Sequence, residues 1–140
     1  MIREYHETDL KYVIEVWHSS VLIAHNFLTE EFIRIEQNNL IDVYIPNTKT
    51  FVYLYDNIVV GFISLIGNEV GGLFVSPLYQ RKNIGKLLIE YSEKLVGKLE
   101  VEVFDKNIIG KSFYYKNNFL LIKESIHKET SEKVLRLRQK

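Results

Sequence analysis

Residues 73–89 constrain the fold of this chain more than any other stretch. A short apolar run is followed by a loop rich in cations, and then by apolar residues at helical spacing. The pattern predicts a buried strand, a loop and the start of an amphipathic helix. The first backbone N–H groups of a helix have no partner inside it, and the helix dipole favours negative charge there. Because Arg81, Lys82 and Lys86 add positive charge at the same point, the segment predicts a site for a phosphorylated cofactor.

This loop matches neither of two common phosphate-binding motifs. The chain contains no Gly-x-x-x-x-Gly-Lys-Ser/Thr spacing and no Gly-x-Gly-x-x-Gly spacing. A nucleoside triphosphate held by the first motif, or a dinucleotide held by the second, is therefore not expected. An ordinary strand–loop–helix connection with basic surface residues is the alternative that the loop alone leaves open.

The composition is that of one globular domain. The 140 residues are 46% hydrophobic and 26% charged, which predicts a single domain over residues 1–140 with a substantial core. Lys plus Arg equals Asp plus Glu at 18 each, and this balance argues against a nucleic-acid partner. Cysteine is absent, which excludes disulfides, thiolate catalysis and Cys-based zinc sites.

Neither a metal site nor a membrane segment is expected. His6, His18 and His127 share no metal-ligand spacing, so no metal is predicted. The first residues, MIREYHE, are charged and lack the apolar core of a signal peptide, and no apolar run approaches membrane-spanning length. These features predict a cytoplasmic protein without a membrane partner.

Periodicity and turn residues predict a mixed order of strands and helices. Thr8 or Asp9 is expected to cap the first helix, and Thr29 is expected to cap the second. Hairpin turns are expected at Asp56-Asn57 and at Gly67-Asn68. The expected strands are 2–5, 51–55, 58–66, 69–75, 99–104, 119–127 and 134–138. The expected helices run from residue 8 or 9 to 24, from 29 to a point before Pro46, from 84 to Gly97, and from 107 to 117. This order, β-α-α-β-β-β-α-β-α-β-β, predicts an α+β layer fold. The last strand alternates apolar and basic residues, and pairing of this strand with a second copy would make a homodimer.

The loop resembles the acetyl-CoA loop of the GNAT family of N-acetyltransferases, Gln/Arg-x-x-Gly-x-Gly/Ala. Gln80 matches its first position and Gly85 its last, while Asn83 stands where the family has glycine. Asn tolerates a positive φ better than most residues, so the turn is expected to form. A second resemblance begins at Asn107, followed by FYYKNNF at residues 113–119, against Phe-Tyr-x-Lys-x-Gly-Phe in the family.

The element order also resembles the GNAT arrangement along the whole chain. The resemblance implies a GNAT fold with a mixed, mostly antiparallel sheet flanked by helices. The segment from Trp17 to Leu28, with its HNFL sequence, is similar to the small bacterial YjaB-like branch of this family. Asn118 replaces a family glycine where a helix end requires positive φ, for which Asn is the next best residue.

The resemblance implies that acetyl-CoA is the co-substrate and assigns residues to it. The pantetheine is expected to contact Leu73, Phe74 and Val75. The pyrophosphate is expected to contact Gln80, Arg81, Lys82, Asn83, Ile84, Gly85 and Lys86. Asn107 is expected to be a further contact with the cofactor. Tyr114 falls on the general-acid position. Acyl transfer from a thioester to an amine requires protonation of the leaving thiolate, and a tyrosine hydroxyl with a pKa near 10 suits that role.

The general base and the acceptor are less determined. Glu69 begins a strand where family enzymes often have a glutamate, and His25 lies at the end of the first helix, which borders the acceptor site in this fold. Either is a candidate, and deprotonation through water is the alternative. The acceptor is expected to be the primary amine of a small molecule or peptide. Balanced charge and the lack of an acidic cluster in the sequence disfavour polyamines.

Two other functions fit the same residues. A GNAT fold can hold an acyl-CoA as a sensor without turnover, and cofactor binding without CoA release on any amine would indicate this function. The fold can also serve as a protein-interaction domain whose loop binds no cofactor, which a lack of thermal stabilisation by CoA would indicate.

Overall fold

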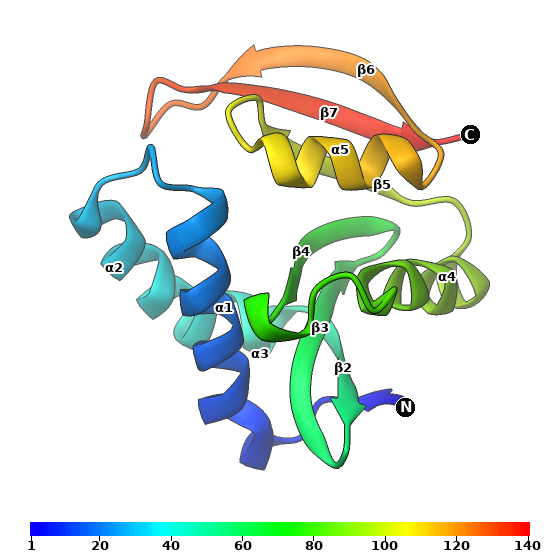
Figure 1. Ribbon diagram of the computed structural model, residues 1–140. Helices are drawn as coiled ribbons and strands as arrows, with labels where there is room; N and C mark the ends of the chain where they lie inside the picture. Colours follow the sequence, from blue (N-terminus) through cyan, green and yellow to red (C-terminus); the bar gives the residue numbers. More distant parts are fainter.

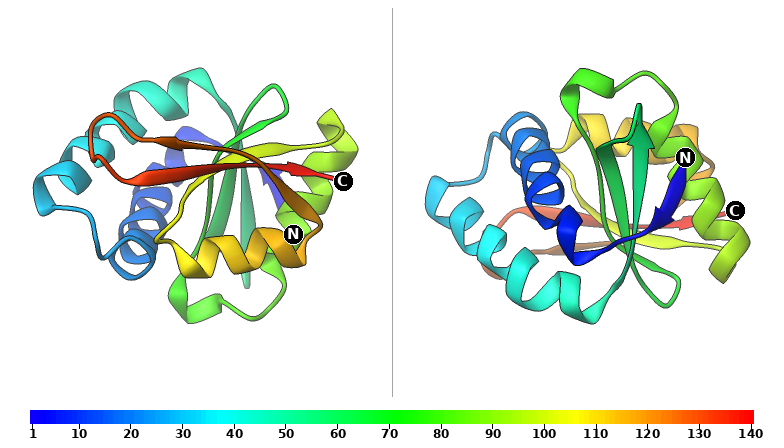
Figure 2. Two further views of the ribbon diagram at one scale, coloured as in Figure 1. Left: turned by 90° about the horizontal axis from the view of Figure 1, so that it is seen from above. Right: turned by 90° about the horizontal axis from the view of Figure 1, so that it is seen from below.

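A computed structural model describes residues 1–140 as a seven-stranded sheet with helices on both faces (Figures 1 and 2). The strands are β1 (Ile2–Glu4), β2 (Lys49–Tyr55), β3 (Ile58–Ile66), β4 (Glu69–Val75), β5 (Glu100–Phe104), β6 (Phe119–Ile126) and β7 (Lys133–Gln139). The helices are α1 (Leu10–Ala24), α2 (Glu30–Asn39), α3 (Ile45–Asn47), α4 (Ile84–Val96) and α5 (Ile108–Lys116). The expected fold class is confirmed, and so is the order of its main elements.

Two hydrophobic clusters, one on each face, hold the helices to the sheet. The larger is centred on Leu88, Leu99 and Leu137, and packs α4 and α5 against the strands. The smaller is built around Val13, Trp17 and Phe62, and packs α1 and α2 against β2 and β3. Helical periodicity correctly predicts the burial of Val13, Trp17 and Leu88.

The hairpin turns form as the sequence predicts. Asp56 and Asn57 adopt φ of 49° and 63°, and Gly67 adopts φ of 59°. These left-handed angles fit the twist of the flanking strands. Strands β2, β3 and β4 therefore form an antiparallel meander.

The sheet divides between β4 and β5. These strands run parallel but pair only at Glu69 with Glu100 and at Val70 with Val101. Beyond these pairs, residues 71–75 have a strand partner only on the β3 side. The two halves of the sheet therefore separate towards Val75 and Phe104, the carboxyl ends of the two strands.

Three local expectations were wrong. Asp9 does not cap α1, because its carboxylate binds Arg3 at 2.8 Å and accepts the His6 N–H at 2.8 Å. The second helical segment does not end before Pro46. A wide π-type turn over Leu40–Tyr44 leads into α3, which includes Pro46 near its start, where a missing N–H is tolerated.

The third correction concerns residues 134–138 as a dimerisation edge. β7 lies between β5 and β6 and pairs with both. Its backbone groups are therefore used inside the sheet, and it cannot pair with a second copy of the chain. The edge strands are β1 and β6. None of the helices combines the length and the apolar character that crossing a bilayer requires.

Candidate active site

The residues Gln80–Lys86, called here the basic loop, form an array of free backbone donors. Arg81 and Asn83 adopt left-handed φ values of 68° and 61°, which confirms the expectation that Asn83 serves in place of glycine. The first helical bond of α4 runs from the N–H of Leu87 to the carbonyl of Asn83 at 2.9 Å. The N–H groups of residues 81–86 donate to no other backbone group. Such consecutive donors at a helix N-terminus favour an anion.

The cations of the loop are exposed to solvent. Lys82 Nζ lies 5.3 Å from the centroid of the Tyr55 ring. Lys86 lies 4.0 Å from the Glu90 carboxylate, too far for a strong ion pair. Arg81 has no acidic partner. Their positive charge therefore remains available for a ligand.

Gly85 allows α4 and α5 to approach closely. A Cβ atom at this position would lie 2.8 Å from the Phe113 ring, which is closer than real side chains come. Phe113 precedes Tyr114 in α5, and the two rings meet edge to face. The glycine of the first motif therefore also positions the helix that carries the second.

Side chains from two other elements secure the end of β4. The carbonyl of Val75 accepts from Ser20 Oγ of α1 at 2.9 Å and from Gln80 Nε2 at 3.2 Å. Leu73 and Phe74 are half-buried on the side where β4 leaves β5. Gln80 thus shapes the start of the basic loop through its side chain.

Tyr114 is 7% exposed and packs against Phe119 in the larger core cluster. Burial raises the pKa of its hydroxyl above the usual value of 10. Every fully buried side-chain polar atom of the protein has a hydrogen-bond partner, yet the Tyr114 hydroxyl makes no hydrogen bond within the chain. The hydroxyl is therefore the part of the side chain that reaches accessible space.

Asn107 and His25, which are far apart in the sequence, meet in the structure. Asn107 Oδ1 accepts the Gly110 N–H at 2.9 Å and so caps α5, as its sequence position predicted. Its Nδ2 lies 3.2 Å from His25 Nε2. Because the amide oxygen is used by the cap, the amide nitrogen donates to His25, and the imidazole proton resides on Nδ1.

Aromatic rings surround this pair. The His25 ring lies 5.8 Å from Phe27 and 5.6 Å from Phe104, both edge to face. Burial lowers the pKa of His25 to about 4, so the imidazole is neutral at physiological pH. We use the name His25 centre for the group formed by His25, Phe27, Phe104 and Asn107. It joins the end of α1, the end of β5 and the start of α5.

Glu69 lies apart from these residues. Its carboxylate pairs with Arg136 of β7, which also binds Glu100 at 3.0 Å and lies 3.6 Å from Glu102. Arg136 thus bridges β4, β5 and β7 where β4 and β5 are still paired. The structure brings Asn107 and His25 together near Phe104, at the open end of the divided sheet, and leaves Glu69 at the closed end. Tyr114 lies further along α5, against Phe119.

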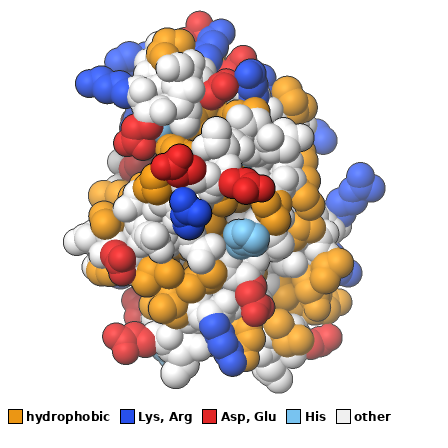
Figure 3. Space-filling view, turned by 90° about the vertical axis from the view of Figure 1, so that its left-hand side faces the viewer, with side chains coloured by type: hydrophobic (Ala, Val, Ile, Leu, Met, Phe, Trp, Pro, Cys, Tyr) orange, Lys and Arg blue, Asp and Glu red, His pale blue; other side chains and the backbone are white.

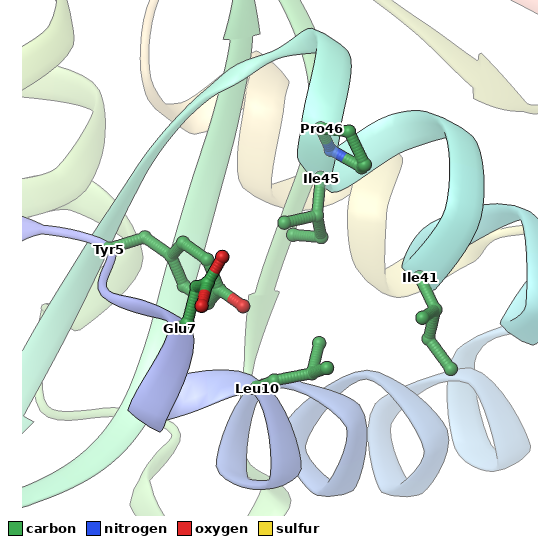
Figure 4. A pocket seen from close by; sticks show the side chains of 6 residues that line it. All are labelled: Tyr5, Glu7, Leu10, Ile41, Ile45 and Pro46. Atoms are coloured by element: carbon green, nitrogen blue, oxygen red, sulfur yellow. The ribbon is translucent and has the colours of Figure 1, made fainter.

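A hollow of about 460 Å³ lies elsewhere on the molecule (Figure 4). Its apolar walls come from the start of α1 and from the π-type turn and α3, with Tyr5 and Glu7 at one side (Figure 4). None of the predicted site residues lines it. No group of three or more His, Cys, Asp or Glu is arranged to hold a metal ion.

Sequence reasoning missed three residues that organise this region. Ser20 is a buried polar residue on the apolar face of α1, and that placement was the available signal. Arg136 gave no signal, because its partners lie on other strands. Phe27 was noted only within a segment, since its contact with Phe104 is long-range.

Comparison with known proteins gives one family and several relatives. Residues 46–120 match the family model described as acetyltransferase (GNAT) domain. The chain is 30% identical over 123 residues to peptidyl-lysine N-acetyltransferase YiaC of Escherichia coli strain K12, covering 87% of this chain and 84% of that protein. It is 32% identical over 118 residues to peptidyl-lysine N-acetyltransferase YjaB of Salmonella typhimurium, covering 84% of this chain and 80% of that protein.

Solved structures agree with these relatives. The solution structure of apo-form YjaB from Escherichia coli superimposes with a TM-score of 0.86 at 25% identity, covering 99% of this chain and 95% of that one. The PaiA N-acetyltransferase of Thermoplasma acidophilum, solved in complex with coenzyme A, superimposes with a TM-score of 0.78 at 25% identity. That match covers 100% of this chain and 98% of the other.

Proposed function

The chain belongs to the GNAT acetyltransferase family, and from this premise we propose that it transfers an acetyl group from acetyl-CoA directly to a lysine side-chain amine of a peptide or protein. It is an N-acetyltransferase, and acetyl-CoA is the co-substrate of this family. The single observation that carries the detailed proposal is the free donor array of the basic loop at the open end of the divided sheet.

The donors and cations of this chain fit coenzyme A. The N–H groups of residues 81–86, with Arg81 and Lys86, would hold the pyrophosphate. The free edge of Leu73–Val75 would hydrogen-bond the pantetheine amides, because β5 has already separated there. When bound, acetyl-CoA supplies an activated acetyl thioester.

Tyr114 is proposed as the general acid. The hydroxyl is protonated at physiological pH and has no competing partner within the chain, so its proton is available to the leaving thiolate. In the reaction, the amine nitrogen forms a bond to the acetyl carbon, the carbon–sulfur bond breaks, and Tyr114 donates its proton to the sulfur. No covalent enzyme intermediate is required.

His25 is proposed to position Asn107 and not to act as the base. Its Nε2 lone pair is engaged by the Asn107 amide, and its Nδ1 carries the ring proton. Glu69 is held by Arg136. The amine proton is therefore proposed to leave through water, which requires no dedicated base.

The names of two relatives support lysine as the acceptor. The YiaC and YjaB proteins are described as peptidyl-lysine N-acetyltransferases, and each match covers at least 80% of both chains. A cytoplasmic location is part of the same proposal, because acetyl-CoA and newly made proteins are both present there.

Incubation of the purified protein with acetyl-CoA and lysine-containing peptides tests the proposal. We expect free coenzyme A to be released in step with a gain of one acetyl group per peptide, located on lysine by tandem mass spectrometry. Blocking the peptide amino terminus separates lysine from terminal-amine acetylation. Binding of acetyl-CoA without turnover of any amine would indicate the sensor function instead.

A further inference from the structure

A second, smaller hollow lies beside the His25 centre. Its volume is about 140 Å³, and it lies between the α1–α2 connection and the β6–β7 turn. Phe27 and Phe32 supply aromatic walls, and Glu129 and Glu132 supply carboxylates from the opposite side. Phe27 is shared with the His25 centre, so the hollow adjoins that centre.

Of the two carboxylates that line this hollow, that of Glu132 is paired with Lys106, and that of Glu129 is not paired. Glu129 is exposed and forms no ion pair. Burial, the carboxylate of Glu36 and, to a smaller extent, the carboxylate of Glu129 raise the pKa of Tyr44 to about 12. Acidic side chains lie among hydrophobic ones on the molecular face that holds α2 and the β6–β7 turn (Figure 3).

A cation of the chain itself already binds at one corner of this hollow. Lys106 Nζ lies 3.2 Å from the Glu132 carboxylate and 5.9 Å from the centroid of the Phe27 ring. At this corner, a carboxylate and an aromatic ring together contact the ammonium group of Lys106. Glu129 and Phe32 line the same hollow, and Glu129 has no cationic partner from the chain.

The turn that carries Glu129 is ordered by its own hydrogen bonds. The His127 N–H donates to the Glu132 carbonyl at 2.8 Å, and Thr130 Oγ1 lies 3.1 Å from His127 Nδ1. The His127 ring also meets Phe32 edge to face at 6.0 Å. The carboxylate is therefore presented from a fixed turn, which reduces the entropy lost on binding.

We infer that this hollow is a specificity subsite for a positively charged residue that flanks the acceptor lysine in a peptide or protein. Glu129 is the charged contact, and Phe27 and Phe32 form the aromatic wall. The inference rests on the proposed function, since the subsite requires a lysine acceptor at the adjacent reaction site. A peptide is favoured over a small amine because the hollow lies beyond the His25 centre and opens to solvent.

Paired peptides test this inference. Each carries one lysine and a blocked amino terminus, and the pair differs only in Arg or Gln at one flanking position, scanned along both sides. We expect kcat/KM of the wild-type protein to be about three- to fivefold higher for the Arg peptide at the best position, the range of a partly exposed ion pair, and the preference to decline with added salt.

Variants connect the preference to Glu129. Glu129→Gln is expected to reduce the Arg-to-Gln ratio to about one, with kcat/KM for the Gln peptide unchanged. Glu129→Lys is expected to favour a Glu-flanked peptide. Glu15→Gln, which changes an exposed and unpaired carboxylate on α1, is the matched control and should retain the wild-type ratio.

Each remaining outcome overturns a defined part of the inference. Equal turnover of Arg and Gln peptides by the wild-type protein would refute the subsite and leave the proposed function intact. Turnover of no lysine peptide would refute both. Preferred turnover of spermidine that depends on Glu129 would assign the second charge to a polyamine and refute the peptide substrate.

Discussion

The basic loop and the His25 centre are constructed in opposite ways. The basic loop is contiguous in sequence and exposed, and its chemistry comes from backbone N–H groups set by two left-handed residues. The His25 centre collects side chains from α1, the following connection, β5 and the start of α5, and it is shielded by aromatic rings. The comparison indicates that the proposed cofactor site is encoded locally in this chain, whereas the proposed acceptor side is created by tertiary contacts.

The largest expected effect concerns Tyr114, the proposed general acid. Tyr114→Phe should reduce kcat by about 10²- to 10⁴-fold, the usual contribution of a general acid, and leave the affinity for acetyl-CoA nearly unchanged. Stability should change little, because the hydroxyl has no partner within the chain. Steady-state kinetics by coenzyme A release measure the effect, with Tyr115→Phe, an exposed neighbour, as the control. An unchanged kcat would remove Tyr114 from the mechanism.

The next effect tests the burial of His25. The folded pKa of about 4 is below the unfolded value of about 6.5, so the unfolded state binds the extra proton between these values. The contribution of His25 to the free energy of unfolding is fully present above about pH 6.5. It decreases by up to about 3 kcal/mol as the pH falls towards 4. Denaturant unfolding from pH 7 to 4.5 measures the loss.

Two variants make that pH prediction specific. His25→Asn should flatten the decline, since the titrating group is gone. His18→Asn, at an exposed position of α1, should retain it. A wild-type profile that stays level over this range would show that His25 accepts its proton freely, and that the His25 centre is open to water.

A smaller effect should separate the backbone contribution of the basic loop from its charge. Asn83→Val places a β-branched residue at a φ of 61°, which should cost about 1–2 kcal/mol of stability. It should also weaken acetyl-CoA binding, while Asn83→Gly preserves both. Thermal denaturation and calorimetric titration report the two quantities. Equal behaviour of the Val and Gly variants would argue against a required left-handed turn.

The smallest effects come from single cations. Lys86→Gln should weaken acetyl-CoA binding about two- to fivefold, in keeping with an exposed charge, and the difference should shrink at high salt. Lys94→Gln, near the other end of α4, is the control and should bind like the wild-type protein. A loss of binding above a hundredfold would show that charge, and not the backbone array, dominates the site.

The same contrast explains what the sequence could predict. The order of strands and helices along the chain, the hairpin at Asp56 and the positive φ of Asn83 and Asn118 follow from short-range patterns, and all were confirmed. The cap formed by Asn107 was also local. Periodicity also located the strands and the apolar face of α1, whereas on α4 the expected apolar residues Leu87, Tyr91 and Leu95 are exposed. These features depend on neighbours within a few residues, where sequence reasoning is strongest.

What depended on distant partners was not predicted. The capping role of Asp9 was overridden by an ion pair with Arg3. The prediction that the strand at 134–138 pairs with a second copy was wrong, because the last strand in the sequence need not lie at the edge of the sheet. The sequence shows no acidic cluster, yet folding brings Glu36 and Glu129 near Tyr44. Each case depends on which segments the fold places side by side.

The most direct test of the account is to follow the backbone amides by nuclear magnetic resonance while acetyl-CoA is added. We expect the largest shifts at residues 81–86, with micromolar binding of roughly −8 kcal/mol, because these N–H groups gain the pyrophosphate as acceptor. The Gly67 turn and the far end of α4 should remain unchanged. Binding that leaves residues 81–86 unperturbed, or no binding at all, would contradict the central claim.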